Sequence, residues 1–191
     1  MVGLRERRHQ ETRAQLVAVA FELFAERGFD QVTMEEVSLA AGVSRSTAYR
    51  RFATKEDVVL EIPRRWLAVF DDAIAHTPSD ASLPAAVEAS CLAVARHIDD
   101  NRDLVRSAYT ILEGSPTLQQ TGVATSAWLE RMVSVVEQFS DADLETARTV
   151  AGAYLGAIDA MMQHWAATGA TTSVAASTAR LASRLAPILP A

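Results

Sequence analysis

The stretch that decides the fold runs from Thr33 to Lys55 and reads TMEEVSLAAGVSRSTAYRRFATK. Its first part predicts a short helix that begins after Thr33, because a threonine N-cap followed three residues later by Glu36 forms a capping box. Val37 and Ala40 are expected to give this helix an inward face. The stretch therefore opens with a well-defined helix start.

The second part of the stretch predicts another short helix, which follows a turn at Gly42 and is capped by Ser44. Glycine suits that turn because it adopts a left-handed backbone at the lowest cost. At helical spacing the residues that can point inward are Val43, Thr47, Ala48 and Phe52. The residues left outside are Arg45, Ser46, Tyr49, Arg50 and Arg51. Such a helix fits the DNA major groove, where arginine can bind guanine through two hydrogen bonds. A helical hairpin with a solvated arginine face is the alternative.

The flanks of this stretch extend the helical pattern. Residues 1–10 form a polar arm with three arginines, expected either to be unstructured or to follow a DNA backbone. A helix is predicted from about Glu11 to Arg27, and Gly28 ends it. A further helix opens after Thr54, with Asp57 in the capping-box position, and Pro63 must either kink or break it.

The rest of the chain predicts further helices and no strand. Apolar stripes mark helices over about 83–98, 104–112, 128–139, 141–168 and 172–185. The segment from Val150 to Met162 is apolar nearly all round, with Asp159 as its only charge. A helix of this kind is normally buried on every side. We expect one of its faces to meet a second subunit; a core helix within a monomer is the alternative.

The charge of the chain is unevenly distributed. Up to Lys55 there are nine basic and seven acidic residues, whereas the remainder carries nine basic and seventeen acidic ones, within a net charge of −6. This asymmetry favours an N-terminal end that faces nucleic acid. No apolar run reaches the length of a membrane span, so a cytoplasmic protein that does not enter membranes is expected.

Catalytic and metal-binding patterns are not found in the sequence. It holds no nucleophile motif, phosphate loop or dinucleotide fingerprint, so an enzyme is not expected. The four histidines lack metal-ligand spacing, and no cofactor is predicted. Cys91 lies on an apolar stripe, where a buried thiol is expected.

Several motifs between Thr12 and Leu60 resemble the TetR family of bacterial transcriptional regulators. They are Phe21-x-x-Phe24-x-x-x-Gly28-Phe29, Thr33 with its acidic pair, Val37-x-x-Ala40-x-Gly42-Val43-Ser44, and Thr47-x-Tyr49-x-x-Phe52-x-x-Lys55. The chain departs from the family at Ala48, where a larger aliphatic is common, so looser packing of the second helix is expected. From about Glu61 onward it resembles the family only in its helical character and length.

The resemblance implies an all-α protein with two domains. Residues 1–54 would be a three-helix helix-turn-helix DNA-binding domain with its arm. Residues 55–191 would be a larger helical domain for effector binding and dimerisation, entered through a linking helix over 55–75.

The resemblance also implies the roles of individual residues on a palindromic operator in double-stranded DNA. Base edges would be faced by Arg45, Ser46 and Arg50. Phosphates would be contacted by Thr33, Ser44, Thr47, Tyr49, Arg51 and Lys55. Glu35 is not expected to contact a base, because a carboxylate near phosphate is repelled.

The resemblance finally implies a homodimer that is released from DNA by a small, hydrophobic effector. Dimer contacts are expected at Gly152, Tyr154, Gly156, Ile158, Leu181 and Leu185. The candidate effector-binding residues are Trp66, Phe70, His97, Tyr109, Glu113, Trp128, Met132, Met162, Gln163 and Trp165, although ordinary core is the favoured interpretation of any single aromatic among them. Two other functions stay open: an architectural DNA-binding protein without an effector, and a protein adaptor that has lost DNA binding.

Overall fold

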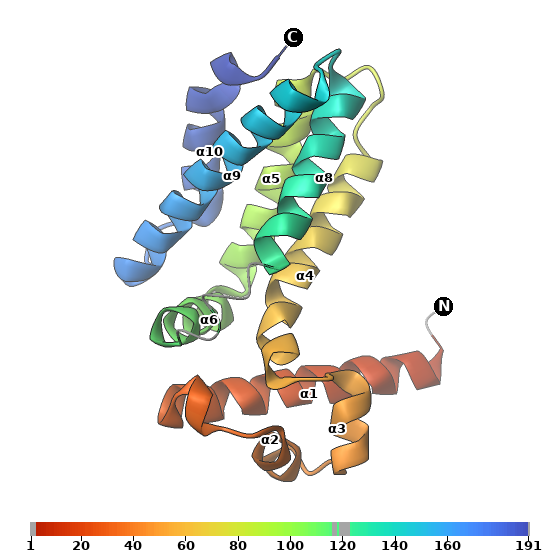
Figure 1. The fold of residues 1–191 in the computed structure, drawn as a ribbon, viewed down its shortest axis with the longest axis vertical. Helices are drawn as coiled ribbons and strands as arrows, with labels where there is room; N and C mark the ends of the chain where they lie inside the picture. The colour runs from red at the N-terminus through yellow and green to blue at the C-terminus, as the bar shows by residue number, and fades with distance from the viewer. Residues whose placement is uncertain (1–2, 116–117, 119–122, 191) are drawn as a thin grey trace. The chain divides into compact units, whose positions relative to one another are not determined.

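Helices account for all the regular structure in the residues that the computed structural model describes, 3–115, 118 and 123–190 (Figure 1). The all-α prediction is therefore confirmed. The first part of the chain holds α1 (Leu4–Arg27), a 3₁₀ turn η1 (Phe29–Gln31), α2 (Met34–Ala40) and α3 (Arg45–Arg51). The second part holds α4 (Lys55–Ala75), α5 (Leu83–Asp100), α6 (Arg102–Gly114), α8 (Val123–Phe139), α9 (Leu144–Ala167), α10 (Val174–Leu185) and η2 (Ala186–Ile188).

The chain forms two compact units. One contains Met1–Ile62 together with Ser107–Thr121, and the other contains Pro63–Arg106 together with Gly122–Ala191. The division falls inside α4 at Pro63, and α4 remains helical through that proline. The prediction left a kink or a break open at this position; the helix is not broken.

The start of α1 differs from the prediction. The helix begins at Leu4, so residues 4–10 are helical rather than an unstructured arm. The physical reason lies in the residue types, because Arg, Glu and Gln are good helix formers and no Gly or Pro interrupts the chain between Leu4 and Arg27. The side chain of Arg5 lies outside the described residues.

Three phenylalanines lie together in the core of the first unit. Phe24 packs edge-on against Phe29, with ring centroids 4.9 Å apart, and Phe21 lies 6.3 Å from Phe24. Both α1 and α3 contact α2. The two short helices α2 and α3 are thereby held by packing, and this gives them the stability that seven-residue helices lack in isolation.

In the second unit α10 packs against α5 and α9, and α8 packs against α9 and α5 (Figure 1). The predicted stripe of α5 is buried throughout, at Leu83, Val87, Cys91, Val94 and Ile98. Burial raises the pKa of the Cys91 thiol to about 12, so this cysteine stays protonated and inert.

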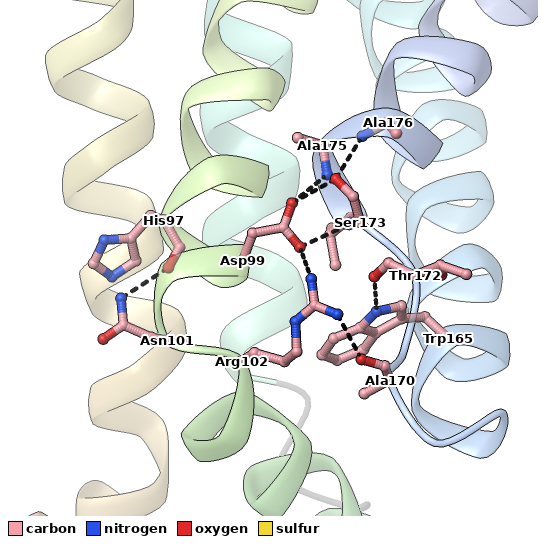
Figure 2. Close-up of polar contacts among 11 residues, drawn as sticks. His97, Asp99, Asn101, Arg102, Trp165, Ala170, Thr172, Ser173, Ala175 and Ala176 are labelled. Atoms are coloured by element: carbon pink, nitrogen blue, oxygen red, sulfur yellow. Dashed lines mark hydrogen bonds and ion pairs between the residues drawn. The ribbon is translucent and has the colours of Figure 1, made fainter.

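A carboxylate from α5 ties α10 into this unit (Figure 2). Asp99 accepts hydrogen bonds from Ser173 Oγ at 2.7 Å and from the backbone N–H groups of Val174 and Ala175 at 2.9 and 3.0 Å. Arg102 donates to the same carboxylate at 2.9 Å. Burial opposes the charge of Asp99, but the hydrogen bonds and Arg102 outweigh it, so the pKa of Asp99 lies below its ordinary value.

The connection between α9 and α10 is held from two sides (Figure 2). Arg102 Nη1 donates to the carbonyl of Ala170 at 2.9 Å, and the Trp165 indole N–H donates to the carbonyl of Thr172 at 2.9 Å. These bonds satisfy carbonyls that no helix pairs, and they fix the point where α10 begins.

Candidate nucleic-acid interface

The start of α2 is built by the predicted capping box. The Thr33 backbone N–H and hydroxyl both donate to Glu36 Oε2 at 2.8 Å, and the Glu36 N–H returns to Thr33 Oγ1 at 3.3 Å. Arg27 adds an ion pair to Glu36 at 2.7 Å. The Thr33 backbone bond, followed by the Arg27 and Thr33 side-chain bonds, lowers the pKa of Glu36 to about 2. The carboxylate that caps α2 is therefore ionised at neutral pH.

The turn between α2 and α3 has the predicted left-handed glycine. Gly42 has φ +65°. The backbone N–H of the following residue, Val43, donates a hydrogen bond to the carbonyl of Ser38 at 3.0 Å. From α1, the Gln15 amide donates to the carbonyl of Ala41 at 2.9 Å. These bonds satisfy carbonyls at the end of α2 and set its angle to α3.

The inward face of α2 differs from the prediction at one position. The buried residues are Met34, Val37, Ser38 and Ala41, whereas Ala40 is exposed. The prediction was wrong at Ala40 because the buried stripe of this short helix continues to its last turn through Ala41. Leu39 is also exposed.

The predicted cap of α3 is present. The Thr47 N–H donates to Ser44 Oγ at 3.2 Å. Ala48 is 0% exposed and Phe52 is buried, whereas Val43 and Thr47 are half-buried. The looser packing expected at Ala48 stays a prediction; the side chain itself is fully covered.

The outer face of α3 carries the polar groups singled out in the sequence. Its exposed members are Arg45, Ser46, Tyr49 and Arg50, and Arg51 is half-buried. Arg50 Nη2 donates to Thr47 Oγ1 at 3.1 Å. The face thus presents two exposed guanidinium groups, a phenol and a hydroxyl on seven residues of helix.

Two of these groups are bound to a carboxylate of α2. Arg45 forms an ion pair with Glu35 Oε1, and the Tyr49 hydroxyl donates to the same oxygen at 3.1 Å. The backbone N–H of Glu35 and the Tyr49 hydroxyl, with Arg45 nearby, hold the pKa of Glu35 below its ordinary value. The same hydrogen bond raises the pKa of Tyr49. Glu35 is therefore a charged member of the α3 surface.

Lys55 begins α4 and is half-buried. Its ammonium donates to the carbonyls of Phe29 at 2.9 Å and Val32 at 3.2 Å, and it lies 4.4 Å from the centroid of the Phe29 ring. Thr54 and Asp57 form the predicted capping box at this helix start, with bonds of 3.2 Å in each direction. Lys55 thus also holds the segment between α1 and α2.

A further charged group supports α3 and was missed in the sequence. Arg13 of α1 donates to the Arg51 carbonyl at 3.0 Å, pairs with the largely buried Glu61 at 2.5 Å, and lies 4.4 Å from the centroid of the Phe52 ring. The bond to Glu61 raises the pKa of Arg13 against the effect of burial. A polar residue at Arg13, three positions before the buried Leu16, gives no sequence signal of this role.

The candidate effector-binding residues, which come from α4, α5, α6, α8 and α9, lie at different depths. Phe70, Met132, Met162 and Trp165 are buried; Trp66, His97, Tyr109 and Trp128 are half-buried; Gln163 is exposed; and the side chain of Glu113 lies outside the described residues. Phe70 and Trp128 pack edge-to-face with centroids 5.4 Å apart. Among the described residues, no group of three His, Cys, Asp or Glu side chains is placed to hold a metal ion.

The candidate dimer residues separate into three groups. Gly152 and Gly156 are exposed, and Ile158, Leu181 and Leu185 are half-buried. Tyr154 is only 1% exposed and lies in the core of its own chain, so its assignment to an interface is wrong. The sequence of α9 is apolar nearly all round, and its pattern therefore does not show which face points inward. Burial also raises the pKa of Tyr154. Because Gly152, Ala153, Gly156 and Ala160 are exposed, α9 is not a core helix buried on every side.

Within the described residues, none of the helices is both long enough and apolar enough to cross a bilayer.

Similarity to known proteins is concentrated in this interface. Residues 16–62 match the family described as "Bacterial regulatory proteins, tetR family". The chain is 43% identical over 58 residues to the HTH-type transcriptional regulator TcmR of Streptomyces glaucescens, covering 30% of this chain and about a quarter (26%) of TcmR. It is 27% identical over 162 residues to the putative mycofactocin biosynthesis transcriptional regulator MftR of Mycobacterium tuberculosis, covering 83% and 82% of the two chains.

Solved structures extend the likeness of fold to the whole chain. The fatty acid degradation regulator FadR from Bacillus halodurans gives a TM-score of 0.69 at 17% identity, covering 91% of this chain and 94% of that one. FadR from Thermus thermophilus, a TetR-family transcriptional repressor solved with lauroyl-CoA, gives 0.60 at 22% identity, covering 94% and 95%.

Proposed function

Because the chain belongs to the TetR family of bacterial regulatory proteins, we propose that it is a ligand-responsive repressor. It binds a palindromic operator as a homodimer and is released by a small, hydrophobic effector. The observation that carries this proposal is the exposed face of α3, which presents Arg45, Tyr49 and Arg50. The opposite side of the same helix is buried.

The DNA contacts are proposed from the positions that these residues share with the family's pattern, and the groups assigned to base edges are exposed. Arg45, Ser46 and Arg50 face base edges, where a guanidinium can bind guanine O6 and N7 together. Thr33, Ser44, Thr47, Tyr49, Arg51 and Lys55 contact phosphates, which set the register of the helix. Lys55 does so while donating to the Phe29 and Val32 carbonyls.

The dimer contact is supported by the exposed face of α9. Glycine within a helix costs about 1 kcal/mol relative to alanine. A Cβ added at Gly152 or Gly156 would meet no atom within 4 Å beyond its chain neighbours and the backbone of its own helical turns. Nothing inside the subunit therefore requires glycine at these positions. A second helix that approaches closely would require it, because a side chain would keep the two backbones apart. We therefore assign this face to contact with a second copy of the chain. The half-buried Ile158, Leu181 and Leu185 would contribute to the same contact.

The effector is proposed to bind the second unit. Its aromatic and methionine side chains provide apolar surface, and Trp66, His97 and Trp128 are only half-buried. FadR of Thermus thermophilus binds lauroyl-CoA, which makes acyl-CoA thioesters the first class to test. A ~100-fold preference of the effector for the form that does not bind DNA corresponds to a coupling of about 2.7 kcal/mol.

Selection of random duplex DNA on the purified protein tests the DNA-binding part. The proposal predicts an enriched motif made of two inverted half-sites. No enrichment by a folded protein would contradict sequence-specific binding and favour the adaptor function. Tight binding without a motif would favour the architectural one.

Release from the selected duplex tests the effector part. Lauroyl-CoA is titrated into the protein–DNA complex, with free coenzyme A as the matched control for the charged headgroup. Release by lauroyl-CoA alone would support an acyl effector. Equal response to both compounds would contradict a hydrophobic ligand of this class.

A further inference from the structure

Glu35 is the acidic residue that stands inside the cationic surface of α3. It lies in the first turn of α2, yet its Oε1 atom accepts from Arg45 and from the Tyr49 hydroxyl, which lie 10 and 14 residues further along the chain. The Arg45 side chain is 70% exposed and that of Glu35 is 39% exposed. Exposed ion pairs contribute little to folding stability, so α2 and α3 do not depend on this contact to pack together. Its geometry, one oxygen shared by two donors, points instead to the orientation of the two side chains.

The contact leaves Arg45 able to bind a base. A guanidinium has five N–H donors in a planar fork, and the carboxylate engages Nη2. The other donors can address guanine while Glu35 holds the group in place. An arginine fixed before binding loses less rotamer freedom on contact with DNA, and this favours the base for which the fixed geometry is suited.

Tyr49 is oriented by the same oxygen. It lies one helical turn after Arg45 on α3, so a single carboxylate fixes two neighbouring side chains of the recognition surface. Since the pKa of Glu35 is lowered, the carboxylate is charged at neutral pH and can serve both donors.

We propose that Glu35 is a specificity-determining residue that positions Arg45 and Tyr49 for operator recognition without contacting DNA itself. This inference rests on the proposed function, because it requires α3 to read a DNA sequence. The carboxylate lowers affinity for every duplex by its charge, and it raises discrimination between the operator and other DNA by ordering the side chains that read it.

The test is Glu35→Gln, which removes the charge but keeps the size of the side chain. The capping box of α2 uses Glu36 rather than Glu35, so the substitution leaves the helix start intact. Glu26→Gln on α1 is the matched control, since it removes the same charge from an exposed position of the same unit. Thermal unfolding checks that both variants remain folded.

Affinities are measured on the selected operator and on random duplex at one salt concentration. We expect Glu35→Gln to bind random duplex about threefold tighter, while its ratio of operator to random affinity falls about tenfold. Glu26→Gln should change that ratio by less than about twofold. The base position that loses preference should be the one that Arg45→Ala also relaxes.

A double variant separates positioning from repulsion. If Glu35 acts through Arg45, adding Glu35→Gln to Arg45→Ala should leave the remaining discrimination almost unchanged. If Glu35→Gln raises both affinities equally, the ratio of operator to random affinity stays unchanged. That result would overturn the proposal, because charge repulsion between Glu35 and DNA would explain it alone. A raised ratio would overturn it in favour of competition between Glu35 and the operator for Arg45. If the wild-type protein selects no motif, the proposed function itself fails, and this inference falls with it.

Discussion

Two exposed helix faces of this protein differ in chemistry. The outer face of α3 carries Arg45, Tyr49 and Arg50 and is tied to Glu35 by hydrogen bonds within the chain. The outer face of α9 carries glycine and alanine, with Asp159 as its one charge between Val150 and Met162. Both faces are open to solvent in the single chain, so exposure alone does not distinguish their partners.

Side-chain chemistry distinguishes the partner that each face can bind. Arginine and tyrosine on a short helix provide directional donors for phosphates and base edges. Small residues provide no donors and only a close approach of backbones, which suits another helix. We therefore interpret the α3 face as a DNA-binding surface and the α9 face as a subunit contact.

The largest effect is expected at α9. Replacing Gly156 by leucine should weaken self-association at least ~1000-fold, about 4 kcal/mol, because the added side chain keeps a second helix away. The isolated chain should become more stable by about 1 kcal/mol, since leucine favours a helix and a Cβ there meets nothing beyond its chain neighbours and the backbone of its own helical turns. Sedimentation over a range of concentrations and urea unfolding measure the two effects.

Ser134→Leu on α8 is the matched control for this change. It places the same bulk at an exposed position outside the α9 face and should leave self-association unchanged. Equal association of the Gly156→Leu variant and the wild type would remove α9 from the subunit contact.

The next effect concerns the support of α10, which packs against α9. Asp99→Asn should destabilise the protein by about 2 kcal/mol, because charge-assisted bonds to Ser173, Val174 and Arg102 are weakened. The folded pKa of Asp99 is lowered, so its contribution is present above the unfolded value of about 3.9 and is lost as pH falls through the folded pKa.

Urea unfolding at several pH values checks this prediction. The stability difference between wild type and variant should be largest near neutral pH and shrink below about pH 4. A difference that does not depend on pH would show that the charge of Asp99 is not what holds α10.

Arg45→Ala tests the α3 face. Loss of the Arg45 side chain should reduce the preference for one base pair in each half-site about tenfold. The affinity for random duplex should change less. Selection with the variant protein measures the change. Recovery of the wild-type motif at full strength would exclude Arg45 from base recognition.

The smallest effect is expected at Lys55. Lys55→Ala should weaken binding to all sequences similarly and reduce the slope of log affinity against log salt by about one. Because Lys55 also holds the Phe29 and Val32 carbonyls, a stability loss of about 1 kcal/mol should accompany it. An unchanged salt slope in a folded variant would leave Lys55 with this structural role alone.

The sequence predicted local features of the α2–α3 region well. Thr33, Gly42 and Ser44 act within a few residues of their partners, so their spacing alone specifies the caps and the turn. The buried stripe of α5 was predicted for the same reason, since helical periodicity is a local property.

Long-range pairings could not be predicted in this way. The bonds of Glu35 to Arg45, of Arg13 to Glu61 and of Asp99 to Ser173 span 10, 48 and 74 residues. They depend on how helices cross, which periodicity does not encode. Tyr154 was misplaced for a related reason: α9 is apolar nearly all round, so its pattern does not show which side meets the core.

The most direct test of the central claim is the mass of the protein–DNA complex on duplexes with one and two copies of the selected half-site. We expect two chains on the two-site duplex, and much weaker binding when one half-site is scrambled, because a dimer then loses half of its specific contacts. One chain per duplex, or equal affinity for both duplexes, would contradict the proposal that α3 binds DNA in a dimer formed through α9.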